Sequence, residues 1–241
     1  MLSIQAEMCF PFEYSFYKDL HMDKIKNVVE VGCGNGNYLR ILKTHFPNAI
    51  YEGLDHCEEF IKIARQTISD DLNIKHASLE GLTNNHDLII LRLVLHQIED
   101  RISFIKKLSE VLNNDSQVIV IESWDVKFRL YPTLVNFLNH LKRHRDILSP
   151  NTASRHLKDC LKEEMKKVGL ILDKENYYYV PSTLPGYKEK YYSYMLATSK
   201  IIGCSEEVIR DINAWYYNPA AYAQIGLFIS NFKKEKVRDK L

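Results

Sequence analysis

The sequence predicts an α/β fold, with a doubly wound, mostly parallel sheet covered by helices on both faces. Three observations carry this prediction. A short buried strand over residues 27–31 runs into a glycine-rich loop, aliphatic strand segments follow it, and amphipathic helices separate these strands. Strands that alternate with helices pair in parallel through right-handed crossovers. Such a sheet gathers its ligands at the carboxyl ends of its strands.

The first half of the chain alternates regularly. A helix over residues 37–45 is expected to follow the glycines, because its apolar residues have helical spacing and Pro47 lies just beyond its end. The later elements of this half are a strand at 49–54, a helix at 58–68, strands at 74–77 and 87–91, a helix from Asp100 to about 112, and a strand at 117–122.

The alternation stops at Trp124. The second half is predicted to contain an extra helix within 130–148 that starts after Pro132, a helix at 153–168 ended by Gly169, a strand at 177–180, two helices within 187–217 broken near 203–205, and a strand at 222–230. The charged stretch 233–241 is assigned no role.

The bulk properties exclude several classes of protein. A net charge of +1 gives no electrostatic reason to bind nucleic acid, and no apolar run is long enough to span a bilayer. The five cysteines are scattered and form no C-x-x-C pair, which is typical of reduced thiols. Neither they nor the histidines at positions 140 and 144 form a zinc ligand set, so no metal is expected. We expect a soluble cytoplasmic protein, a monomer or homodimer, with neither nucleic acid nor membrane as a partner.

The glycine loop predicts a ligand site. Gly32, Gly34 and Gly36 stand at alternate positions and let the backbone turn tightly and approach a ligand. Glu30 precedes them, where a carboxylate would repel a pyrophosphate but suits a cationic ligand such as S-adenosylmethionine. Asp55 follows about twenty residues later, at the end of the second strand, where an acidic side chain can accept both ribose hydroxyls.

The pattern Glu30-Val-Gly-Cys-Gly-Asn-Gly36, followed by Gly53-Leu54-Asp55, resembles the class I (Rossmann-like) S-adenosylmethionine-dependent methyltransferases. The resemblance covers about residues 25–180 and the last strand. It implies one domain over residues 1–241, built on a seven-stranded sheet of order 3-2-1-4-5-7-6 with the last strand antiparallel. Residues of about 1–24, 126–149 and 182–219 fall outside it, and in small-molecule members such additions form a cap over the substrate.

The resemblance also implies residues that hold the cofactor, S-adenosylmethionine. Beyond Glu30, the three glycines and Asp55, it places His56 beside the adenine or ribose, and Ser78 and Leu79 at the adenine. It places the backbone near Arg92 at the methionine ammonium. The family more often has an apolar residue where His56 stands and an aspartate where Ser78 stands.

A second group of residues could act on the acceptor. His96 follows the fourth strand and could be a general base, or it could orient the loop. Glu122 and Asp125 lie past the fifth strand and could bind an acceptor amine or hydroxyl, or cap the extra helix. The chain has 15 tyrosines, and the aromatic residues expected to line a pocket are Tyr14, Tyr17, Trp124, Tyr178 and Tyr192.

Three functions remain open from the sequence. The first is methyl transfer to O, N or C of a small, biosynthetic acceptor. The second is attack on the γ-carbon of the same cofactor, for example by cyclisation, with release of methylthioadenosine. The third is a non-catalytic, cofactor-binding regulatory subunit. An acceptor-sized cavity would favour the first, a cavity filled by tyrosines the second, and an exposed apolar cap the third.

Overall fold

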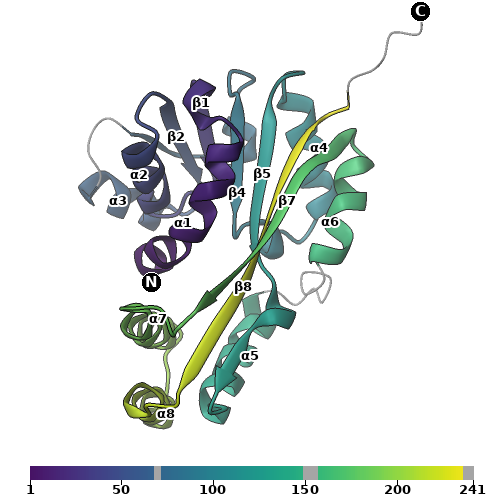
Figure 1. The fold of residues 1–241 in the computed structure, drawn as a ribbon. Helices are drawn as coiled ribbons and strands as arrows, with labels where there is room; N and C mark the ends of the chain where they lie inside the picture. Colours follow the sequence, from purple (N-terminus) through teal and green to yellow (C-terminus); the bar gives the residue numbers. More distant parts are fainter. Residues whose placement is uncertain (68–71, 149–156, 236–241) are drawn as a thin grey trace, which may run out of the picture.

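The computed structural model describes residues 1–67, 72–148 and 157–235, and an eight-stranded sheet runs through this part of the chain. The strands lie in the order β3-β2-β1-β4-β5-β8-β6, and β7 also pairs with β8 (Figure 1). They are β1 (Asn27–Val31), β2 (Ile50–Asp55), β3 (Asn73–His76), β4 (Leu88–Arg92), β5 (Gln117–Ser123), β6 (Arg129–Tyr131), β7 (Leu170–Pro181) and β8 (Tyr222–Lys234).

Helices connect these strands. They are α1 (Leu2–Asp19), α2 (Asn37–His45), α3 (Glu58–Thr67), α4 (Arg101–Val111), α5 (Val135–Leu148), α6 (Leu157–Lys166), α7 (Tyr187–Ile201) and α8 (Glu206–Tyr217). Four short 3-10 turns add η1 (Met22–Lys24), η2 (Leu79–Gly81), η3 (Leu95–Gln97) and η4 (Asp125–Lys127).

Strand alternation divides the sheet into two faces. In β1, Val29 and Val31 pack into a core shared with α4 and α6, whereas Val28 packs into a core shared with α1 and α2. Successive side chains of a strand point to opposite faces, so every central strand serves both cores. We call these the α6 face and the α1 face.

The predicted α/β fold and strand order are confirmed. β8 takes the place of the seventh strand, antiparallel between β5 and β7, and β7 takes the place of the sixth. The structure adds the three-residue strand β6, which pairs with Tyr222–Gln224 at the start of β8. The break near residues 203–205 separates α7 from α8, as predicted.

The helix expected to start after Pro132 begins at Val135, and residues 129–131 pair with β8. Two strand boundaries were wrong. β7 begins at Leu170 rather than Tyr177, since pairing with β8 holds its polar first half in the sheet. For the same reason β8 runs on to Lys234. Position 68 of one predicted helix, positions 153–156 of another, and the stretch 236–241 lie outside the described residues.

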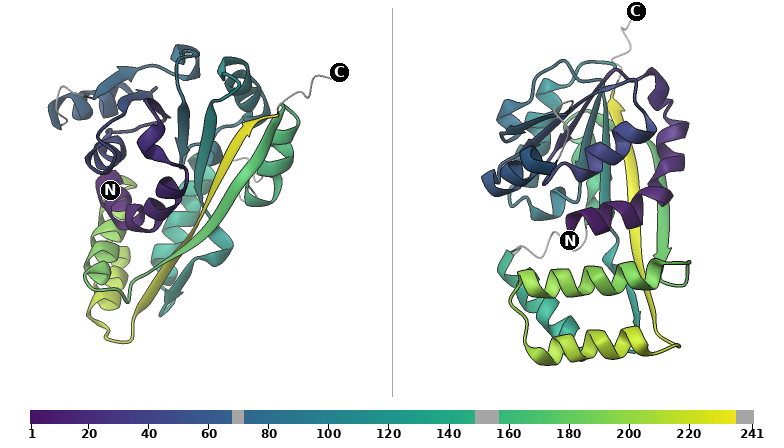
Figure 2. Two further views of the ribbon diagram at one scale, coloured as in Figure 1. Left: turned by 45° about the horizontal axis from the view of Figure 1, so that its top comes forward. Right: turned by 90° about the vertical axis from the view of Figure 1, so that its left-hand side faces the viewer.

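The two long strands reach beyond the rest of the sheet into a separate group of helices. Figures 1 and 2 show β7 and β8 extending to the part that contains α5, α7 and α8. These helices share a core around the fully buried Trp215, and Met8 and Cys9 of α1 join it. We call α5, α7 and α8 the cap. In the described part of the chain, every helix is too short or too polar to cross a membrane.

Candidate functional site

The glycine loop has a backbone that only glycine adopts without strain. Gly32, Gly34 and Gly36 have φ angles of +77°, +55° and +69°, in the left-handed region. The Gly32 amide donates a 2.7 Å hydrogen bond to the Leu54 carbonyl of β2, which fixes where the loop leaves the sheet. The loop then delivers the chain to the N-terminus of α2.

Asp55 ties this loop to the second strand. One carboxylate oxygen accepts the Gly34 amide at 2.7 Å and the other accepts the Cys57 amide at 2.8 Å. Because an ionised carboxylate offers about four acceptor positions, Asp55 retains capacity for further donors. The residue predicted to bind a ribose therefore also sets the shape of the glycine loop.

Glu30 is a buried carboxylate with an unused oxygen. Its Oε2 atom has no hydrogen-bond partner among the described residues, and the same is true of Asn37 Nδ2 on the other side of the loop. Burial raises the pKa of Glu30 to about 8, against the opposing charge of Arg92. A cation placed near Glu30 would favour its ionised form.

A buried polar cluster supports Glu30 from the α1 face. Glu13 of α1 is 0% exposed and pairs with Arg92 at the end of β4, with Oε1 to Nη2 at 3.3 Å. The Tyr38 hydroxyl donates to Glu13 at 2.6 Å, and the Arg92 guanidinium lies 4.5 Å from the Tyr38 ring centre. Tyr17, predicted to line a pocket, is fully buried here, 2.8 Å from the Tyr38 hydroxyl.

Glu13 and Tyr38 were not predicted from the sequence to belong to the site. One signal was present, since Glu13 is the only charged residue between Glu7 and Lys18 in an otherwise apolar and aromatic stretch. When such an apolar helix is buried, its carboxylate is buried with it and needs a cationic or hydrogen-bonding partner. Nothing in the pattern identifies Arg92 as its partner.

The first turn of α1 covers the glycine loop. A Cβ atom on Gly34 would lie 2.9 Å from Leu2 Cδ1, and one on Gly32 would lie 2.4 Å from Val94 Cγ2. Ser3 accepts a 3.3 Å hydrogen bond from Asn35. Leu2 and Val94 thus occupy space directly against the loop.

The residues assigned to the adenine and ribose take different positions. His56 is exposed, with Nδ1 3.9 Å from Asp55 Oδ1. The Ser78 hydroxyl donates to Glu80, whereas the Leu79 side chain is buried in the α6-face core. Of these three residues, His56 and Ser78 carry polar side-chain atoms near the strand ends, whereas Leu79 does not.

His96 and Glu122 form a pair on the α6 face. Glu122 is buried at the end of β5, and its Oε2 atom lies 2.7 Å from His96 Nδ1. Its Oε1 atom accepts the Leu95 amide at 2.7 Å, so one carboxylate fixes both the η3 backbone and the imidazole. Glu122 thereby holds the imidazole through Nδ1 and fixes the orientation of the ring. The side chains of Asp125 and His144 lie outside the described part.

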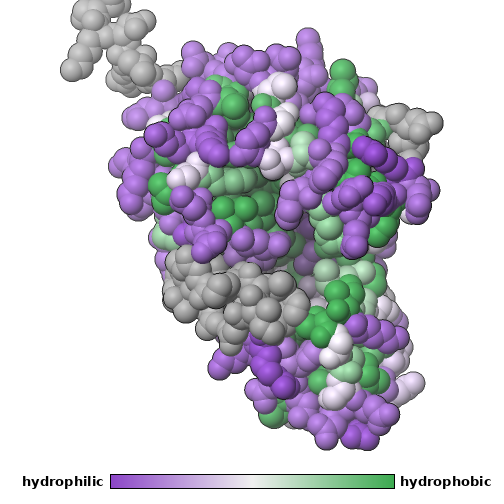
Figure 3. All heavy atoms as spheres, turned by 180° about the vertical axis from the view of Figure 1, so that it is seen from behind, coloured by the Kyte–Doolittle hydropathy of each residue, from purple (hydrophilic) through white to green (hydrophobic). Residues whose placement is uncertain are grey.

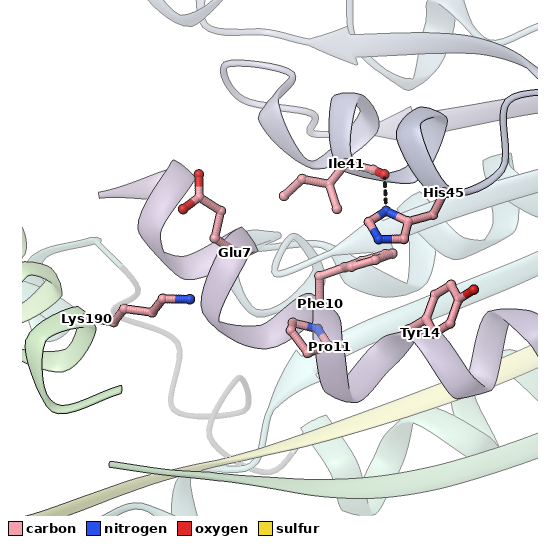
Figure 4. Close-up of a pocket in the computed structure, with 7 residues that line it drawn as sticks. All are labelled: Glu7, Phe10, Pro11, Tyr14, Ile41, His45 and Lys190. Carbon is pink, nitrogen blue, oxygen red and sulfur yellow. Dashed lines mark hydrogen bonds between the residues drawn. The ribbon is translucent and has the colours of Figure 1, made fainter. Parts of the chain in front are cut away.

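The predicted aromatic residues do not gather in one place. Tyr14 lines a cavity of about 590 Å³ with Phe10, Ile41 and His45, between α1, α2 and the Lys190 end of α7 (Figure 4). Tyr178 packs against the α1-face core, and Tyr192 stacks on Tyr216 in the cap at 4.3 Å. Trp124 lies just beyond the end of β5, the strand that carries Glu122.

Comparisons with known proteins agree with this geometry. Residues 29–118 match a family model described as a methyltransferase domain. The candidate methyltransferase 235L of Invertebrate iridescent virus 6 is 21% identical over 125 residues, which are 52% of this chain and 46% of that protein. The match therefore spans about half the length of this relative.

Solved structures show the same fold. A candidate methyltransferase of Bacillus halodurans has a TM-score of 0.56 at 12% identity, covering 88% of this chain and 93% of that one. The plantazolicin methyltransferase BpumL, solved with S-adenosylhomocysteine and a plantazolicin analogue, has a TM-score of 0.53 at 13% identity, covering 97% and 85%. At such identities the likeness establishes the fold.

Proposed function

We propose that this chain binds S-adenosylmethionine and transfers the methyl group to a small acceptor, because residues 29–118 match a model described as a methyltransferase domain and the sheet has the class I order. The reacting O, N or C atom of that acceptor arrives protonated. The single observation that carries this proposal is that the glycine loop and the His96–Glu122 pair, whose carboxylate is buried, lie at the same edge of the sheet.

The residues of the loop fit the cofactor. The unused oxygen of Glu30 and the unused amide nitrogen of Asn37 are buried polar groups that would gain partners from a polar ligand. Gly32 and Gly34 provide a surface without Cβ atoms, on which Leu2 and Val94 now lie. Asp55 would accept the ribose hydroxyls. When bound, S-adenosylmethionine supplies an electrophilic methyl group on a sulfonium.

The chain's own residues would align the acceptor and remove its proton. His96 would take this proton at Nε2, because Glu122 holds its Nδ1 and stabilises the imidazolium that forms. Cap residues would exclude water from the edge. The acceptor binds as a small molecule, and neither nucleic acid nor a membrane is needed.

The first experiment separates the candidate functions. Purified protein is incubated with S-adenosylmethionine, and the products are identified by mass spectrometry with and without a panel of phenols, amines and carboxylic acids. S-adenosylhomocysteine formed with an acceptor supports methyl transfer. Methylthioadenosine formed without an acceptor would contradict methyl transfer and indicate attack on the γ-carbon of the cofactor. A cofactor that binds but never reacts would indicate a regulatory subunit.

The cofactor site is tested by calorimetry. Asp55→Ala should abolish tight binding of S-adenosylmethionine, because it removes the ribose acceptor and the support of the Gly34 amide. Near-native affinity in this variant would contradict the site assignment.

The base is tested by His96→Asn. We expect it to lower kcat by roughly 10²–10⁴-fold while the Kd of S-adenosylmethionine stays unchanged. His21→Asn, at an exposed residue that already has a left-handed backbone, is the matched control. A parallel loss of cofactor affinity and thermal stability in His96→Asn, without a specific loss of kcat, would mean that His96 only orients the loop.

A further inference from the structure

An exposed aromatic cluster lies on the same face as the His96–Glu122 pair. Its members are Trp124 of the β5–η4 connection and Tyr177 and Tyr179 of β7. The Trp124 ring centre lies 5.0 Å from that of Tyr177 and 6.4 Å from that of Tyr179. The two tyrosines are 41% and 43% exposed, although large aromatic residues of this chain are more often buried.

Strand register fixes which way these rings point. Glu122 pairs with Phe228 of β8, and Phe228 pairs with Tyr177. Residues directly opposite in antiparallel strands project to the same side, so Glu122 and Tyr177 share the α6 face. Two strand spacings separate them, roughly 10 Å. The fully buried Phe228 side chain lies between them on the same face.

A glycine lets the η4 turn pack against β8 in the middle of the cluster. The next row of the sheet places Gly226 of β8 between Trp124, whose amide donates to the Gly226 carbonyl at 2.8 Å, and Tyr179, which pairs with Gly226. A Cβ atom on Gly226 would lie 2.7 Å from Lys127 Cβ and 3.2 Å from the Trp124 carbonyl. Gly226 thus lets η4 and the Trp124 ring come close to β8.

The electrostatics of the cluster suit a flat, electron-rich ligand. Lys127 Nζ lies 4.9 Å from the Trp124 ring centre and Lys158 Nζ lies 5.1 Å from that of Tyr177. Lys158 is also paired with Glu175 at 3.3 Å. An ammonium group attracts the π electrons of a nearby ring, and these two would likewise attract those of an electron-rich aromatic ligand placed next to them. Figure 3 shows a hollow with hydrophobic residues beside it, between the sheet-bearing part and the helices below.

From these observations we infer that Trp124, Tyr177 and Tyr179 form a stacking platform for a flat aromatic acceptor, which they hold beside the His96–Glu122 pair. The inference rests on the proposed function, whose acceptor class it specifies. Tyr178, between the two platform tyrosines, points to the α1 face and takes no part. Of the five aromatic residues that the sequence predicted to bind substrate, Trp124 belongs to the platform and the other four do not.

The test uses two alcohols with the same skeleton. 2-Naphthol is flat and aromatic, whereas decahydro-2-naphthol is saturated and puckered. Each is titrated into the full chain, without cofactor, by ligand-observed NMR. We expect 2-naphthol to bind at least tenfold more tightly and to show upfield ring-current shifts. Equal affinity for the two alcohols, or no binding of 2-naphthol, would overturn the platform.

Variants locate the binding. Tyr177→Leu with Tyr179→Leu should weaken 2-naphthol roughly tenfold, since each stacked pair contributes a factor of about 2–10. The corresponding double Phe variant keeps both rings and should retain the affinity. Tyr217→Leu, at a residue 77% exposed in the cap, is the matched control. Unchanged binding in a folded double Leu variant would also refute the inference.

The outcome is separable from that of the proposed function. The titration requires no S-adenosylmethionine, so a chain that fails to bind the cofactor can still bind 2-naphthol on the platform. Conversely, S-adenosylhomocysteine formed from other acceptors, with no naphthol binding, would support methyl transfer and exclude a stacking platform.

Discussion

The α1 face and the α6 face end at the same edge of the sheet, but they differ in how far their polar and aromatic side chains are buried. On the α1 face, Glu13, Arg92 and Tyr38 are buried and bonded to one another. On the α6 face, Tyr177 and Tyr179 keep two fifths of their surface exposed beside the His96–Glu122 pair. The first arrangement is suited to holding a constant ligand, and the second to admitting a variable one.

The largest expected effect comes from breaking the buried pair. Glu13→Leu leaves the Arg92 guanidinium buried without its carboxylate, so it should lower the free energy of unfolding by roughly 3–5 kcal/mol. Urea denaturation measures this change. Glu7→Leu, on the same helix but exposed, should change stability by less than about 0.5 kcal/mol. A loss of similar size in both variants would mean that the pair contributes little.

A second prediction concerns the glycine loop. Gly32→Ala and Gly203→Ala both place a side chain at a left-handed φ, +77° and +72°, but only Gly32 has a close neighbour, Val94. Each should lose roughly 1–2 kcal/mol from backbone strain. Gly32→Ala should lose a further 1–3 kcal/mol or so from overpacking. Thermal melting checks the difference.

Adding Val94→Ala to Gly32→Ala should recover most of this further loss, because it removes the atom that the new Cβ would meet at 2.4 Å. If the double variant melts no higher than Gly32→Ala alone, the contact with Val94 does not determine the loss.

The last prediction is a pH dependence of stability, whose effect per pH unit is modest. The pKa of Glu30 is about 8 in the folded chain against an ordinary value of 4.5. Between these values the folded state binds more protons than the unfolded state, so the free energy of unfolding falls as pH rises from about 4.5 to about 8. The slope from this group is at most roughly 1.4 kcal/mol per pH unit.

Glu30→Gln should remove this part of the slope, as measured by urea denaturation at several pH values. Exposed Glu110→Gln should leave the slope as in the unchanged chain. A slope that is identical in all three proteins would show that Glu30 is ionised throughout this range. Such a result would mean that burial on the α1 face does not raise the pKa of Glu30.

The same contrast explains what could be read from the sequence. The loop around Gly32, the capping of α4 by Asp100 and the strand order depend on local patterns or on general rules of parallel sheets, and they were predictable. The α1-face cluster depends on Glu13 meeting Arg92, 79 positions away. No local pattern encodes such a meeting.

The acceptor side was harder still. Trp124 was singled out, but Tyr177 and Tyr179 were not preferred to Tyr178, because alternation alone does not tell which tyrosines of a strand face the functional side. That choice is made by the register of β7 on β8, including a shift between Leu172 and Lys174. β6 was missed because three residues are too few to give a strand pattern.

The place of β8 in the chain also bears on biosynthesis. β8 pairs with β5, β6 and β7, yet roughly 100 residues separate the end of β5 from its start. At about 5–20 residues per second, the ribosome needs roughly 5–20 s to make that interval. Throughout it, the apolar edge of β5 around Val118–Ile121 has no partner strand, which makes it a template for association between nascent chains. We therefore expect the yield of folded protein in a cell to depend on translation speed and on chaperones that cover this edge of β5.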